Sequence, residues 1–128
     1  MALLLLPSGL AAQDGLLHGK ISRDAGGYTL TIVTLSVNPI RATALLVYAD
    51  STRFTLSPLR SDTSLQGSFH VEYGLYRLTA SQAHAMAFAS RVALAVLGPN
   101  PMRGIAQYGA RAPWRALFDD PESAPEQT

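Results

Sequence analysis

The stretch LTASQAHAMAFASRVALAVLG, residues 78–98, decides how the second half of the chain is interpreted. Alanine and larger residues alternate along it, and a period of two is typical of a β-strand. However, Thr79 followed by Gln82 matches a helix capping box, and Ala, Gln and Met favour helix, whereas Ala is depleted in strands. From Arg91 onwards Val and Leu take over. We therefore predict a helix over 80–90 and a strand over 91–97.

Two large side chains of this predicted helix cannot share one face. Met86 and Phe88 are two residues apart, which separates them by about 200° at 3.6 residues per turn. We therefore expect the helix to be covered on two sides, or Phe88 to lie at an edge or an interface.

The rest of the chain divides into short β segments, because Gly, Pro, Asp and Ser recur between runs of Val, Ile, Thr, Leu and Tyr. We predict strands at 15–23 and 28–37, a hairpin within 42–59 that turns at 49–52, a polar loop at 60–67, strands at 68–78 and 102–110, and a helix at 112–118. These elements predict an α+β domain. It would have a mainly antiparallel sheet of five to seven strands, one capped helix packed on it, and a short C-terminal helix.

Alternation in the strand at 68–78 predicts which side chains are buried. Phe69, Val71 and Tyr73 share one face and are expected to face the core, whereas the opposite face is polar. Gly74 interrupts the pattern, and a lone glycine in a strand often marks a bulge that changes the facing of the residues after it.

The polar face of this strand carries Ser68, His70 and Glu72, a candidate ligand-binding set. A histidine and a carboxylate two residues apart suit metal ligation, with His84 or His18 as a third ligand, or a general base with its orienting group. The same pattern also describes a solvated sheet face. The identity of any metal stays unknown.

A second candidate set lies near the expected bulge. Tyr73, Tyr76 and Arg77 combine aromatic and cationic side chains that can line a ligand groove. Tyrosines at a sheet edge with their hydroxyl groups in water are the alternative.

The predicted C-terminal helix has an apolar face. Pro113 suits the first helical position, and Trp114, Leu117 and Phe118 follow at i, i+3 and i+4. Together with Phe88, these side chains are candidates for binding a partner. The alternative is that the helix docks on its own sheet, since a small domain rarely leaves its only tryptophan outside.

Composition limits the kinds of partner. The formal net charge is +1, and the ten Lys and Arg residues are scattered singly rather than clustered on a stripe, which argues against nucleic-acid binding. The chain has no cysteine and so no disulfide or thiolate metal site. Residues 14–118 form the predicted domain, and residues 119–128 have the composition of a disordered acidic tail.

The first residues, MALLLLPSGLAAQDG, resemble the end of a secretory signal. The small residues near Ala12 and Gln13 suit peptidase cleavage, although no positive charge precedes the leucine run and the run is short. We predict a truncated signal segment at 1–13 and an exported, periplasmic or extracellular chain. A cytoplasmic chain with an apolar N-terminal strand is the alternative. The run is too short to span a bilayer.

No phosphate-binding loop, dinucleotide fingerprint, zinc-protease motif or nucleophile elbow occurs in the sequence, and no cofactor is predicted. The leading hypothesis is a non-catalytic domain that binds another protein or a component of the cell envelope. The alternative is a small-ligand or metal-binding module that uses Ser68, His70 and Glu72. An enzyme is the third possibility, and the oligomeric state is left open.

Overall fold

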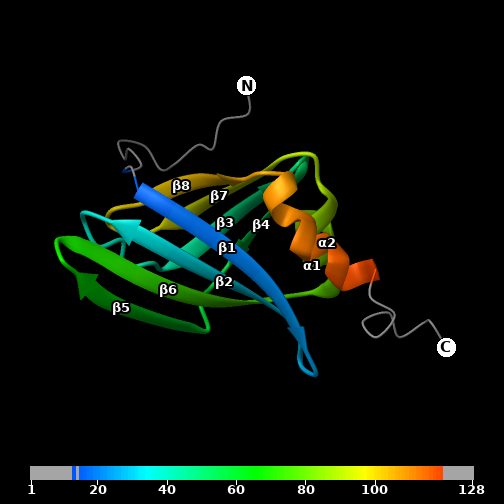
Figure 1. Ribbon diagram of the computed structural model, residues 1–128, viewed down its shortest axis with the longest axis horizontal. Coiled ribbons are helices and arrows are strands. Elements are labelled where there is room, and N and C mark those ends of the chain that lie inside the picture. The colour runs from blue at the N-terminus through cyan, green and yellow to red at the C-terminus, as the bar shows by residue number, and fades with distance from the viewer. Residues whose placement is uncertain (1–12, 14, 120–128) are drawn as a thin grey trace.

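The computed structural model describes Gln13 and residues 15–119. Apart from Gln13 and the main chain of Asp119, the predicted signal segment and the predicted acidic tail lie outside the described residues. Eight strands form two antiparallel four-stranded sheets, accompanied by two α-helices (Figure 1). The α+β class is confirmed. The prediction of one sheet with five to seven strands is wrong.

Successive pairs of strands along the chain belong to the two sheets in turn. The first sheet has the order β1 (Gly15–Asp24), β2 (Gly27–Ser36), β6 (Phe69–Leu78) and β5 (Arg60–Gln66). The second sheet has the order β4 (Thr52–Leu56), β3 (Ala44–Ala49), β7 (Val92–Leu97) and β8 (Met102–Ala106). Consecutive strands therefore pair as hairpins, and successive hairpins belong to opposite sheets.

The turns of these hairpins follow from local chemistry. Between β1 and β2, the Asp24 carboxylate accepts a 2.8 Å hydrogen bond from the Gly26 N–H, which stabilises the turn. Between β5 and β6, Gly67 adopts a φ of 63°, a left-handed conformation that glycine reaches without steric cost.

The core lies between the two sheets. Alternation along β2 is complete, because every even-numbered residue from Tyr28 to Ser36 is buried and the odd-numbered ones are half-buried. The second sheet contributes Leu45, Val47 and Leu94, which have no exposed surface.

Helix α1 (Ala80–Phe88) confirms the division of the opening stretch into helix and strand. Gln82 N–H donates to the Thr79 hydroxyl over 3.0 Å, and Thr79 N–H donates to the Gln82 side-chain oxygen over 2.9 Å, so the capping box is formed. Met86 is buried and Phe88 is at the surface, as their angular separation requires. The helix ends before the predicted Ser90 because Ala89 is extended.

The turn between β3 and β4 is tied to the end of α1. Asp50 has a φ of 53°, and its carboxylate accepts hydrogen bonds of 2.9 Å from the N–H groups of Ser90 and Arg91. These two bonds lower the pKa of Asp50, because they favour the ionised carboxylate. The predicted hairpin turn is thereby confirmed and joined to the chain that leads into β7.

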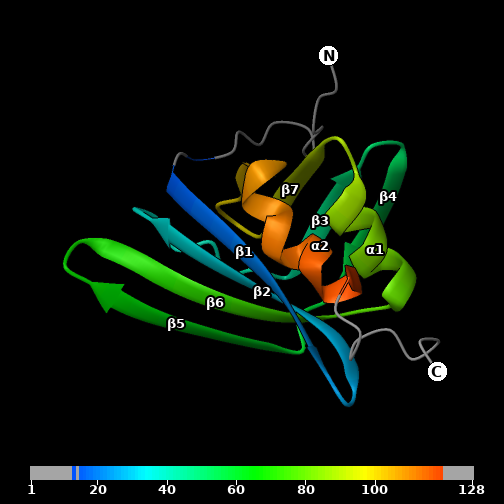
Figure 2. The same ribbon diagram turned by 45° about the vertical axis from the view of Figure 1, so that its right-hand side comes forward.

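Helix α2 (Ala112–Asp119) follows the 3-10 turn η1 (Gly109–Arg111) and lies beside α1 at one end of the sheets (Figure 2). Its Trp114 is 4% exposed and belongs to the core cluster. Docking of the C-terminal helix on its own domain is therefore confirmed.

The polar segment 60–67, predicted as a loop, contains the strand β5. Every residue of β5 is exposed, so it lacks the apolar face by which strands are recognised in a sequence. Its pairing with β6 defines it, from Arg60 opposite Leu75 to Gln66 opposite Phe69.

The predicted bulge at Gly74 is also wrong, because β6 pairs without interruption with both β2 and β5. A Cβ atom at Gly74 would lie 2.9 Å from the Tyr76 ring, so glycine is needed for close packing. The facing of β6 is the reverse of the prediction, because Glu72, Gly74 and Tyr76 point inwards and Tyr73 points outwards.

Candidate functional site

Glu72, the central residue of the predicted ligand set, is buried and bound to the main chain. Its carboxylate accepts hydrogen bonds from the N–H groups of Ile40 and Arg41, the latter at 3.0 and 3.1 Å to its two oxygens. Ile40 is itself fully buried, and Arg41 has a φ of 55°. The carboxylate therefore holds the connection between β2 and β3 in a strained conformation, which is a structural task.

The other two members of the predicted set do not share this environment. Ser68 is exposed in the turn before β6, and His70 is half-buried. Among the residues that the structure describes, no group of three or more His, Asp or Glu side chains is placed to hold a metal ion. Neither His18 nor His84 belongs to such a group with Glu72.

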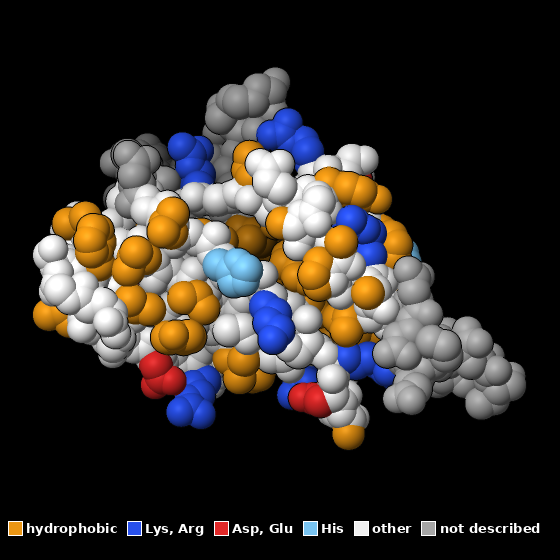
Figure 3. All heavy atoms as spheres, in the orientation of Figure 1, with side chains coloured by type: hydrophobic (Ala, Val, Ile, Leu, Met, Phe, Trp, Pro, Cys, Tyr) orange, Lys and Arg blue, Asp and Glu red, His pale blue; other side chains and the backbone are white. Residues whose placement is uncertain are grey.

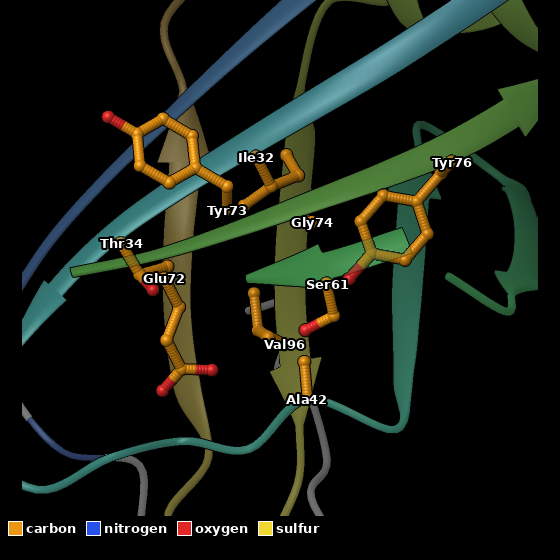
Figure 4. A pocket seen from close by; sticks show the side chains of 9 residues that line it. All are labelled: Ile32, Thr34, Ala42, Ser61, Glu72, Tyr73, Gly74, Tyr76 and Val96. Carbon is orange, nitrogen blue, oxygen red and sulfur yellow. The ribbon is translucent and has the colours of Figure 1, made fainter. Parts of the chain in front are cut away.

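The second predicted set is divided between the two faces of β6. Tyr76 is fully buried, and Figure 4 shows Tyr73 pointing to the side opposite Glu72 and Tyr76. Arg77 is on the outer side, 3.8 Å from the carboxylate of Asp24. Burial, and secondly the charge of Glu72, raises the pKa of Tyr76 to about 12. These three side chains therefore do not line one groove.

The space beside Glu72 and Tyr76 is too small for an organic ligand. The cavity there measures about 10 Å³ and is also lined by Thr34, whose buried hydroxyl oxygen has no hydrogen-bond partner among the described atoms (Figure 4). A volume of this order accommodates one water molecule.

Two of the predicted partner-binding residues, Phe88 and Phe118, form an aromatic cluster with Tyr28 and His84. Phe118 stacks on Tyr28 with ring centroids 5.4 Å apart, and Phe88 stacks on His84 at 4.5 Å. Phe88 and Phe118 meet edge to face at 5.8 Å. Leu117 and Phe118 are half-buried against the core, and Phe88 is 39% exposed. The cluster joins the two helices.

Arg111, which sequence analysis did not single out, is fully buried and binds main-chain carbonyl groups. Its Nε donates to Ala106, its Nη1 to Met86 and Ala87, and its Nη2 to Ser90, at 2.8–3.3 Å. Met86 and Ala87 lie in the last turn of α1, where carbonyl groups lack helical partners and carry the negative end of the dipole. Arg111 therefore caps this helix from another part of the chain.

Arg115 supports the same region. It donates to the carbonyl groups of Ala87 and Tyr108 and lies 3.8 Å from the centre of the Tyr108 ring. Burial and then the charge of Arg115 lower the pKa of Arg111. Arg111 therefore remains a buried cation, and no described carboxylate forms an ion pair with it.

The outer face of the first sheet presents apolar side chains to solvent. Register places Leu16, Leu35 and Val71 side by side across β1, β2 and β6. Tyr73 and Phe69 flank this row and are 50% and 44% exposed. Figure 3 shows hydrophobic side chains gathered at the end of the sheet away from the helices.

Strand β5 gives this sheet an open edge. Its seven residues are all exposed and include no proline, which is one of the devices that protect sheet edges. The only local signal for this strand is the turn at Gly67, which begins a hairpin with the more legible β6.

No protein-family model, curated protein or solved structure matches this chain. None of the helices in the described part of the chain is long and apolar enough to cross a bilayer.

Proposed function

We propose that this chain is a non-catalytic protein-interaction domain that associates by adding a strand to the open edge at β5. The observation that carries the proposal is a seven-residue edge strand, Arg60–Gln66, whose residues are all exposed. An edge of this kind presents a row of main-chain N–H and C=O groups that another strand satisfies. Among the other edge strands, β4 is shorter and ends in the buried Leu56.

The strand that fits this edge best is β5 of a second copy. In an antiparallel register centred on Thr63, all seven residues of one strand face seven of the other. Arg60 then lies opposite Gln66 of the second copy, and Asp62 lies opposite Ser64. No like charges meet, and the central pair is Thr with Thr, which is favourable across antiparallel strands.

Substitutions of opposite charge at Ser64 test this register. Ser64→Asp would place a second carboxylate opposite Asp62 at two symmetric positions, so the dimer should dissociate up to about thirtyfold more readily, at up to ~1 kcal/mol for each pair. Ser64→Lys is the matched control, since it places an attractive charge there and should keep or strengthen the dimer. Sedimentation equilibrium measures both dissociation constants.

Two results would contradict the proposal. A chain that stays monomeric up to millimolar concentration does not pair through β5. A dimer that responds equally to Ser64→Asp and Ser64→Lys pairs elsewhere. Because Ser64 is exposed, neither substitution should change the free energy of unfolding of the monomer by more than about 0.5 kcal/mol.

We further propose that the domain acts outside the cytoplasm, in contact with the cell envelope. This proposal is supported by the leucine run at 3–6 and the small residues before Gln13. Expressed with its own upstream coding sequence, the chain should be exported and should begin near Gln13 or Asp14, as N-terminal sequencing of the mature product would show. Retention in the cytosol with an intact N-terminus would contradict it.

A further inference from the structure

The two sheets leave a cleft between their edge strands β1 and β8. At one end Gln13 closes the gap, because its N–H donates to the Pro101 carbonyl over 2.8 Å and it pairs with Met102. At the Ile105 end the strands are no longer paired. The main-chain groups on the facing edges of both strands therefore border an opening rather than a ladder.

The cleft has a defined volume and an apolar floor. It measures about 120 Å³, and Leu17, Leu94, Ile105 and Trp114 provide its apolar lining. His18 is exposed and lines it from β1. Figure 3 shows a hollow floored by hydrophobic side chains next to a histidine. An apolar cavity of about 150 Å³ in another protein takes up benzene, so a single aromatic ring is the appropriate size of ligand.

A buried positive charge lies in the wall of the same cleft. Arg111 lines it, is fully buried, and is bonded to four carbonyl groups without forming an ion pair with any described carboxylate. Because Arg111 has no exposed surface, it attracts an anion in the cleft through its charge and not by direct contact.

We propose that this cleft binds a small aromatic carboxylate, with its ring against Trp114 and its carboxylate towards Arg111. Trp114 is positioned for this contact because Gly19 lies against its indole ring. A Cβ atom at Gly19 would be 3.6 Å from that ring and 3.2 Å from Ile32, which is tight. Apolar walls with one convergent charged group are the usual composition of a small-molecule site.

Benzoate and benzamide separate the contribution of charge from that of shape. They are nearly isosteric, but only benzoate carries the negative charge that Arg111 attracts. Trp114 is the only tryptophan of the chain, so its fluorescence reports on the cleft directly. Titration with benzoate should give a saturable change, and benzamide should bind at least about tenfold more weakly, a difference of ~1.4 kcal/mol.

Replacing two alanine residues by leucine, one at a time, locates the binding site. Ala110 lines the cleft and is exposed, so Ala110→Leu should fill the space without disturbing the core. Ala116 is exposed on α2 and does not line the cleft, which makes Ala116→Leu the matched control. Ala110→Leu should weaken benzoate binding at least about tenfold. Ala116→Leu should leave it unchanged, and thermal unfolding should show that both variants are folded.

Three outcomes would overturn the proposal. The first is no saturable fluorescence change with benzoate up to its solubility limit. The second is equal affinity for benzamide, which would remove the role of Arg111. The third is equal binding by the Ala110→Leu variant, which would place the ligand elsewhere.

Discussion

Replacing Glu72 with glutamine should lower the free energy of unfolding by about 2–3 kcal/mol, because the carboxylate is the acceptor for two main-chain N–H groups. Glutamine keeps one oxygen acceptor and presents its NH₂ group to a donor. One charge-assisted bond is therefore lost, at about 1.5–3 kcal/mol, and the remaining one becomes neutral and weaker. Relaxation of the connection around Arg41 offsets part of this cost, since its φ of 55° is then no longer enforced.

Equilibrium unfolding in urea measures this change through the midpoint, provided that the slope stays constant. Asp62→Asn is the matched control, because it converts a carboxylate to an amide in an exposed ion pair with Arg60 and should cost less than about 0.5 kcal/mol. If Glu72→Gln were as mild as the control, the carboxylate would not hold the connection between β2 and β3. The predicted role of Glu72 in ligand binding would then again be a candidate explanation for its burial.

Three further substitutions test other parts of the fold. Trp114→Ala should cost about 3–5 kcal/mol through lost burial and a new cavity, and the fluorescence of Trp114 in the intact protein should be blue-shifted; a solvent-like emission spectrum would refute core docking. Thr79→Ala should cost about 1 kcal/mol by removing the cap of α1, and an unchanged urea midpoint would argue against it. Asp50→Asn should destabilise the protein near neutral pH. Because the pKa of Asp50 is depressed below 3.8 in the folded state, its stabilisation is present above that value and is lost as pH falls through the folded-state pKa; the difference between variant and wild type should therefore shrink in acid. A difference that stays constant with pH would contradict the bonds from Ser90 and its neighbour.

The elements that sequence analysis identified correctly are those with a local chemical signal. Thr79 and Gln82 mark the start of α1 because both partners of the capping box lie within one turn. Pro113 and Trp114 indicate the start and the buried face of α2 in the same way. Such signals depend on neighbours in the sequence, so they are legible without knowledge of the fold.

The orientation of β6 could not be obtained in this way. Phe69 and Tyr73 are typical of a buried face, but they point outwards because the inner face is set by contacts with distant segments. Glu72 turns inwards to meet the N–H groups at Ile40, more than thirty residues away. Gly74 gives space to the Tyr76 ring rather than forming a bulge.

The same limit applies to the sites. The predicted ligand set was chosen because a histidine and a carboxylate are spaced for one strand face, yet that spacing says nothing about which groups already bind the carboxylate. Arg111 and the cleft between β1 and β8 have no sequence signature at all. Arg111 gains its importance from the carbonyl groups at the end of α1, and the cleft arises only where two sheet edges meet.

The alternation of hairpins between the two sheets has a consequence for synthesis on the ribosome. Because β2 pairs with β6 and β3 pairs with β7, each sheet is assembled from two hairpins that are separated in the sequence by a hairpin of the other sheet. The first sheet needs residues up to Leu78 to have emerged, and the second needs residues up to Ala106. The apolar faces of the earlier hairpins therefore stay uncovered until their partner strands have emerged.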